Sequence, residues 1–109
     1  MTDGATIATN AAVISAMWTC LLTSAVGATR ILGLPTGAYD GQPFLWRFKQ
    51  PASGGPCGIT LAAGFDLGPL AESPVLPVTA NAVAYLAGYW EAATSHVHLT
   101  GFMPGYGGI

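Results

Sequence analysis

His96 and His98 are the residues of this 109-residue chain best suited to metal chemistry. They are two positions apart, so on a β-strand their imidazoles share one face and could bind a metal ion together. A closed zinc site needs four ligands, however, and Glu91 is the only carboxylate near them in the sequence. We therefore interpret the histidines as a surface or interface pair, and we predict neither a bound metal nor a cofactor.

The acidic residues do not form the pattern of a glycosidase. Cleavage of a glycosidic bond uses two carboxylates that flank a cleft. The five acids of this chain are scattered: Asp3, Asp40, Asp66, Glu72 and Glu91. Asp40 precedes Gly41 and Asp66 lies two residues before Gly68, so hydrogen bonding within turns explains both acids.

Other catalytic motifs are missing from the sequence as well. No serine stands in a G-x-S-x-G nucleophile elbow, and the Gly54-Gly55 and Gly107-Gly108 pairs lack the spacing and the lysine of a phosphate-binding loop. We therefore predict that the protein is not an enzyme and has no catalytic residues.

Three tryptophans could form a platform that stacks on sugars: Trp18, Trp46 and Trp90. Trp46, however, alternates with Phe44 and Phe48, and this alternation favours a place in the protein core.

Cys20 and Cys57 are the only cysteines, and each lies within an apolar strand pattern. A buried thiol that acts as a small hydrophobic group fits this setting. A disulfide between the two is the alternative, although one pair without a secretion signal is weak support for it.

Charge is scarce in this chain. Charged residues make up 7% and hydrophobic residues 51%, whereas an ordinary domain has roughly 25% charged residues. The apolar content excludes intrinsic disorder. With a net charge of −2 and no basic patch, the sequence gives no support for nucleic-acid binding. Solubility depends on surface charge, so we expect other copies or a larger assembly to cover much of the surface, unless Thr, Ser and Gly cover it instead.

The stretch from Gly4 to Thr29 carries no charge and is long enough to span a bilayer. It contains many Thr and Ser residues, and no basic segment precedes it as a signal peptide would require. We therefore predict two strands around a turn in this stretch, and no membrane association.

The segment from Asp40 to Gly68 gives the clearest secondary-structure signal. Phe44, Trp46 and Phe48 alternate with Leu45, Arg47 and Lys49, as expected of a half-buried strand. Ser53-Gly54-Gly55 tolerates positive φ and predicts a hairpin loop that leads into a second strand. The residues expected to face one core are Phe44, Trp46, Phe48, Ile59 and Leu61.

The remainder of the chain reads as short strands separated by turn residues, with no convincing helix. The predicted strands are Ala5–Thr9, Ala16–Ser24, Ala28–Leu34, Pro43–Gln50, Cys57–Ala63, Val75–Thr79, Ala82–Trp90 and Ser95–Phe102. Such spacing predicts an all-β fold: a single antiparallel β-sandwich or jelly-roll domain over residues 1–109. Residues 103–109 are expected to form a frayed tail or a C-terminal arm that docks on another subunit.

Several turn and core motifs of this chain resemble a β-domain of structural proteins in tailed bacteriophages. The motifs are Gly4–Ala8, Arg30–Gly37, Asp40–Phe65, Thr79–Val83 with Leu86 and Tyr89, Thr100–Phe102, and Gly105-Tyr106. Relatives of this kind occur in tail fibres and minor tail proteins, and similar β-domains decorate phage heads. The resemblance implies a fold and a place in the virion, and it implies no catalytic residues.

Two functions follow from the resemblance. The first is a capsid decoration or cement protein, a homo-oligomer and most simply a trimer, that contacts the major capsid protein or other virion proteins. The second is a tail-fibre or minor-tail module that binds a glycan of the host surface. The motifs begin within a few residues of Met1 with no coiled coil or collagen-like repeat before them, which favours the first.

Overall fold

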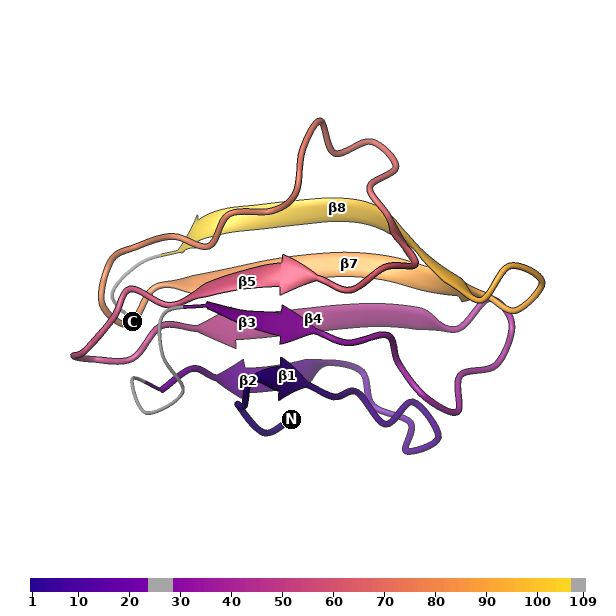
Figure 1. Ribbon diagram of the computed structural model, residues 1–109, viewed down its shortest axis with the longest axis horizontal. Coiled ribbons are helices and arrows are strands. Elements are labelled where there is room, and N and C mark those ends of the chain that lie inside the picture. The colour runs from indigo at the N-terminus through magenta and orange to yellow at the C-terminus, as the bar shows by residue number, and fades with distance from the viewer. Residues whose placement is uncertain (24–28, 107–109) are drawn as a thin grey trace.

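The computed structural model describes residues 1–23 and 29–106, and in them the chain forms strands and loops only (Figure 1). This confirms the prediction of an all-β fold. The strands are β1 (Thr6–Ile7), β2 (Trp18–Leu21), β3 (Thr29–Leu32), β4 (Pro43–Lys49), β5 (Gly58–Leu61), β6 (Phe65–Asp66), β7 (Val83–Glu91) and β8 (His96–Tyr106). No stretch of the described residues forms a helix of the length and apolar character that crossing a lipid bilayer requires.

The strands form two layers. A three-stranded sheet has the order β1-β3-β5, and a five-stranded sheet has the order β2-β4-β7-β8-β6. In Figure 1 the three-stranded sheet lies in front of the five-stranded sheet. Side chains from both layers fill the space between them, which places the core in the middle of a sandwich.

The first five strands wind as a flattened coil between the two layers. β1, β3 and β5 pair in parallel in one layer, while β2 and β4 pair in parallel in the other. Thr6 pairs with Ile31, Trp18 with Trp46 and Thr29 with Gly58, so one turn of the coil takes 25 to 29 residues.

The predicted antiparallel sandwich or jelly-roll is therefore wrong in its strand pairing. Among the strands of the described residues, only β4 with β7 and β7 with β8 pair in the antiparallel sense. Alternating hydrophobicity shows which side chains are buried, but it does not show which strand lies alongside. The two strands predicted between Gly4 and Thr29 do form, as β1 and β2, yet they lie in opposite sheets.

The hairpin predicted around Ser53-Gly54-Gly55 is wrong for the same reason, because β4 and β5 also belong to different sheets. The segment is nevertheless a turn, and Gly54 has a φ of 82°. The Gln50 side chain holds this crossover: its amide donates to the carbonyls of Cys57 (2.7 Å) and Pro77 (2.8 Å) and accepts from the Cys57 N–H (2.9 Å). The buried amide thus satisfies backbone groups that a neighbouring strand would otherwise bond.

The predicted core residues lie where they were expected. Phe44, Trp46, Phe48 and Ile59 are buried, and Leu61 is partly buried against the same cluster. Phe44 stacks on Trp46 with ring centroids 5.0 Å apart, and the Trp46 indole donates to the Thr9 hydroxyl at 2.9 Å. Each such aromatic contributes about 1.5 to 3 kcal/mol by its removal from water.

Two predicted elements differ from the structure. The segment Val75–Thr79 is a loop, anchored by the buried Leu76, and the strand after β5 is instead Phe65–Asp66, where a turn was predicted. β8 continues to Tyr106, so residues 103–106 belong to a strand rather than to a C-terminal arm. Residues 107–109, and the predicted strand ends at Ser24 and Ala28, lie outside the described residues.

Candidate functional site

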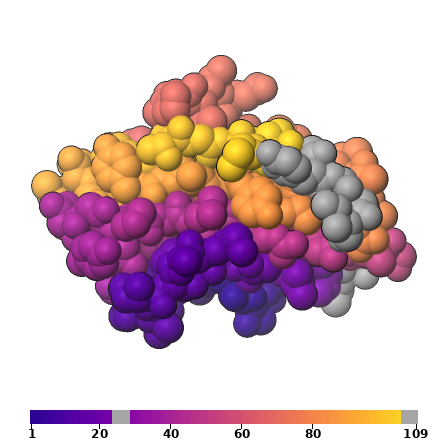
Figure 2. All heavy atoms as spheres, turned by 180° about the vertical axis from the view of Figure 1, so that it is seen from behind, coloured from indigo at the N-terminus to yellow at the C-terminus, as the bar shows by residue number. Residues whose placement is uncertain are grey.

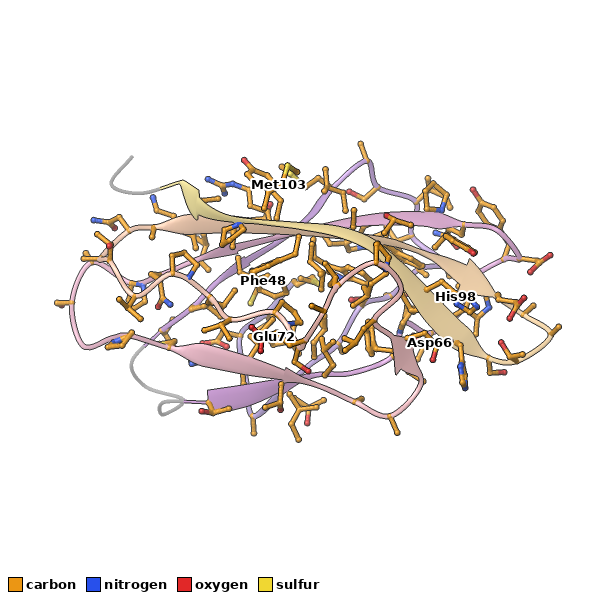
Figure 3. The ribbon with its side chains drawn as sticks, turned by 90° about the horizontal axis from the view of Figure 1, so that it is seen from above. Phe48, Asp66, Glu72, His98 and Met103 are labelled. Atoms are coloured by element: carbon orange, nitrogen blue, oxygen red, sulfur yellow. The ribbon has the colours of Figure 1, made fainter. Side chains whose placement is uncertain are left out.

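The two histidines lie in a cluster of titratable side chains at one end of the five-stranded sheet. β6 pairs with β8 so that Asp66 lies opposite His98. His96 Nδ1 is 3.0 Å and His98 Nδ1 is 3.2 Å from the same Asp66 oxygen, Oδ2. Figure 3 shows Asp66 and His98 together at this end. The cluster is half exposed, since each of these side chains keeps between 29% and 43% of its surface.

Glu91 completes the cluster from β7. Its Oε1 lies 3.0 Å from His98 Nε2 and accepts a hydrogen bond from the Thr94 hydroxyl at 2.6 Å. The Thr94 hydrogen bond, followed by the contact with His98, holds the pKa of Glu91 below its ordinary value. The Tyr89 ring lies beside His98, with centroids 5.2 Å apart.

This arrangement links β6, β7 and β8 at one end of the sheet. Both nitrogens of His98 face carboxylate oxygens, Nδ1 that of Asp66 and Nε2 that of Glu91. Among the described residues, no group of three or more His, Cys, Asp and Glu side chains is arranged to hold a metal ion. The sequence pointed to the histidines and Glu91 but assigned Asp66 to a turn, because β6 is too short to leave a pattern.

A buried ion pair was not recognised from the sequence. The Arg30 side chain is fully buried and that of Asp3 is 4% exposed. Arg30 donates two hydrogen bonds to the Asp3 carboxylate, from Nε to Oδ1 at 2.9 Å and from Nη2 to Oδ2 at 2.7 Å. Asp3 Oδ2 also accepts the backbone N–H of Thr23 at 2.8 Å.

The surroundings of this pair stabilise its charged form. Burial raises the pKa of Asp3, but hydrogen bonds from Arg30 and Thr23 outweigh burial and leave the pKa below its ordinary value. The hydrogen bond to Asp3 likewise raises the pKa of Arg30. Among the described residues, every buried side-chain nitrogen or oxygen has a hydrogen-bond partner, including those of this pair. The pair therefore has a structural role, since it links the N-terminal segment to β3.

Cys20 and Cys57 are both free and buried, so the structure contains no disulfide between them. Burial raises the pKa of Cys20 to about 11. A thiol with this pKa is almost entirely protonated at neutral pH and is a poor nucleophile.

The tryptophans do not form an exposed platform. Trp18 and Trp46 are buried, and Trp90 is partly buried against the core. This agrees with the assignment of Trp46 to the core.

An open groove of about 560 Å³ lies between the edges of the two sheets, beside β1 and β2. Its lining includes Val13, Met17 and Trp18, and its one charged side chain is Asp3, which is paired with Arg30. The groove therefore offers apolar and hydroxyl surface but no reactive group.

The outward face of the five-stranded sheet is a further candidate surface for binding, and we call it the outer sheet face. It consists of the side chains that point away from the core on β2, β4, β7 and β8. These are Thr19, Leu21, Leu45, Arg47, Lys49, Tyr85, Ala87, Tyr89, Gly101 and Met103. Figure 2 shows this face, with β8 in yellow, β7 in orange, β4 in purple and β2 in violet.

Apolar groups dominate the outer sheet face. Leu21 is 59%, Met103 47% and Tyr89 43% exposed. In Figure 3 Met103 lies outside the sandwich whereas Phe48 lies between its layers. The solvent-facing side of an antiparallel sheet is normally polar. An apolar outward face is typical of a surface that contacts another molecule.

No family model, curated protein or solved structure matches this chain. The resemblance to the tailed-phage domain therefore stays a prediction.

Proposed function

We propose that this chain is a structural protein of a tailed-bacteriophage particle: a small decoration protein on the capsid that associates with copies of itself and with other virion proteins. The apolar outer sheet face is the observation that carries this proposal. Exposed apolar side chains gain about 25 cal/mol per Å² when another surface covers them. A sheet with one face in the core and the other against a partner is therefore stabilised by burial of apolar surface on both faces.

Two further observations support an assembly role. Charged residues are only 7% of the chain, and Arg30 and Asp3 are withdrawn from the surface into a buried pair. The surface therefore carries little of the charge that keeps a free monomer soluble. In the cluster at the end of the sheet, His96 and His98 form their contacts with Asp66 and Glu91. Side chains that bind one another in this way suit a structural role better than a catalytic one.

The location on a capsid rests on the resemblance of the turn and core motifs. It is tested with density-gradient-purified phage particles probed by an antibody against the chain and by mass spectrometry of the particle proteins. We expect the chain to sediment with full and empty heads. Recovery with isolated tails, together with binding to host cell-wall sugars, would replace decoration by the tail-module alternative.

A pair of matched variants tests whether the outer sheet face makes the contact. Leu45→Ser removes an apolar side chain from this face, and Ile31→Ser removes one that is 44% exposed on the other sheet. Leu45→Ser should weaken binding to stripped capsids, while Ile31→Ser should bind as the wild type does. Equal binding by both variants would exclude this face as the contact.

A further inference from the structure

The basic and acidic side chains around the outer sheet face lie at opposite ends of the sheet. The chain has three basic side chains, and Arg30 is buried against Asp3. The other two, Arg47 and Lys49, both project from β4 onto this face, and neither forms an ion pair with a described residue. Since Arg47 lies opposite Tyr85 and Lys49 opposite Val83, they mark one end of the sheet, the basic end.

The opposite end carries three acids. Pro43 at the start of β4 lies opposite Tyr89, so Glu91 lies just beyond that start, and Asp66 joins it through His98. Asp40 lies at the same end, because its Oδ1 accepts the N–H of Ala92 at 3.0 Å. The acidic end is Asp40, Asp66 and Glu91, and it lies about 20 Å from the basic end by strand rise.

Between the two ends the face is mainly apolar. Leu45 pairs with Ala87, and Ala87 with Gly101, so two of the three residues in the central row are small. Tyr85, Tyr89 and Met103 border this row. Because Ala87 and Gly101 leave room in this row, a second sheet could approach to the usual separation of about 10 Å.

From this layout we propose that two copies of the chain pair face to face through their outer sheet faces, about a two-fold axis that lies in the plane between the faces and runs across the strands. A two-fold axis brings the basic end of each copy over the acidic end of its partner, so one surface is complementary to itself. The inference deepens the proposed function, since it names the surface by which copies associate, and it rests on that function only for the biological role of the pair.

The size of the face sets the expected strength. The four strands of the face, at a spacing of about 4.8 Å and a length of about 20 Å, give a footprint of roughly 400 Å² per copy. The pair would bury roughly 800 Å² in total, less than a standard stable interface, so we expect a weak, transient dimer that dissociates at micromolar concentrations. The proposed pair is a two-fold dimer, whereas a trimer is the expectation from the sequence.

Two charge-reversed variants provide the test. The first carries Arg47→Glu with Lys49→Glu, which makes both ends of the face acidic. The second carries Asp40→Lys with Glu91→Lys, which makes both ends basic apart from Asp66. Alone, each variant places like charges opposite one another, so its self-association should weaken about tenfold or more, as expected where like charges meet across an interface.

Mixing the two variants should restore the pair. In a mixed dimer, the acidic ends of one chain face the basic ends of the other at both positions. Sedimentation velocity of an equimolar mixture should therefore give a dimer, while each variant alone remains largely monomeric. No structural damage from the substitutions could produce recovery on mixing.

A third variant controls for net charge. Ala71→Lys with Glu72→Lys and Ser73→Lys adds the same charge as the second variant, but on the exposed loop between β6 and β7, and it should associate as the wild type does. Circular dichroism confirms that each variant is folded. A wild type that stays monomeric at high micromolar concentration, a trimer without dimer, or a mixture that stays monomeric would overturn the proposal.

The mixing test and the particle test fail independently. A dimer restored on mixing, with no chain found in phage particles, keeps the interface and removes the virion role. A chain present in particles whose variants do not rescue one another keeps the virion role and removes this interface.

Discussion

Asp3 and Arg30 show how one buried contact can tie together distant parts of a short-stranded protein. Asp3 lies ahead of β1, Arg30 lies in β3, and the carboxylate also binds the Thr23 N–H after β2. Removing one partner of a buried pair leaves the other charge without compensation and typically costs 3 to 5 kcal/mol.

Asp3→Asn should therefore lower the free energy of unfolding by about 3 kcal/mol. Urea denaturation followed by tryptophan fluorescence measures this loss. The double variant Asp3→Asn with Arg30→Met removes both charges and should recover part of it. A single Asp3→Asn change that alters stability by only a few tenths of a kcal/mol would contradict the structural role.

The same pair predicts a pH dependence. The folded-state pKa of Asp3 lies below the ordinary value of 3.8. The stabilisation from its ionised form is thus fully present above that value and is lost as the pH falls through the folded pKa. The stability difference between wild type and Asp3→Asn should be constant from pH 7 to about pH 5 and shrink below about pH 4. A difference that grows on acidification would reverse the sign and exclude this assignment.

At the scale of elements, the β7–β8 pairing depends on a glycine. A Cβ added at Gly88 would lie 2.8 Å from the His98 carbonyl oxygen and 3.2 Å from Val97 Cγ1, next to the bulge in this ladder. The clash is with strand backbone, which cannot move without breaking the sheet.

Gly88→Ala should therefore lower the free energy of unfolding by about 1 to 3 kcal/mol, the range for overpacking. Gly101→Ala is the matched control in the same pair of strands, because a Cβ there meets nothing within 4 Å. Thermal melts of the two variants compare them directly. Equal destabilisation would show that loss of chain flexibility, not the clash at Gly88, dominates.

Sequence reasoning located most strands because each carries its own local pattern. β4 was predicted from the alternation of Phe44, Trp46 and Phe48 with polar and apolar neighbours, and these three residues are buried. Local patterns hold no information on which strands pair, so the parallel coil of β1 to β5 was mistaken for hairpins. β6 has two residues, too few for any period, and it was missed together with the placement of Asp66.

The whole molecule combines a parallel coil with an antiparallel cap, and this explains where its binding surface lies. β7 and β8 extend the sheet beyond β4 and widen its outward face, while the coil provides the opposite layer. The candidate surface could not be predicted from sequence, because its rows cross β2, β4, β7 and β8. Arg47, Lys49 and Glu91 were each visible as charges, but only the register places them at opposite ends.

If charge separation orients the proposed dimer, salt should act with opposite sign on wild type and variant. Raising ionic strength from about 0.1 M to about 1 M shortens the Debye length from about 10 Å to about 3 Å. In the wild type this screens attraction between basic and acidic ends, so dimerisation measured by sedimentation should weaken several-fold. In the variant with Arg47→Glu and Lys49→Glu it screens repulsion, so the residual association should strengthen. Leu45→Ser removes apolar contact and leaves every charge in place. It should weaken association at both salt concentrations, and added salt should weaken its association further, as in the wild type. Salt effects of one sign in all three proteins would show that hydrophobic contact alone drives association and that the charges do not set the orientation of the pair.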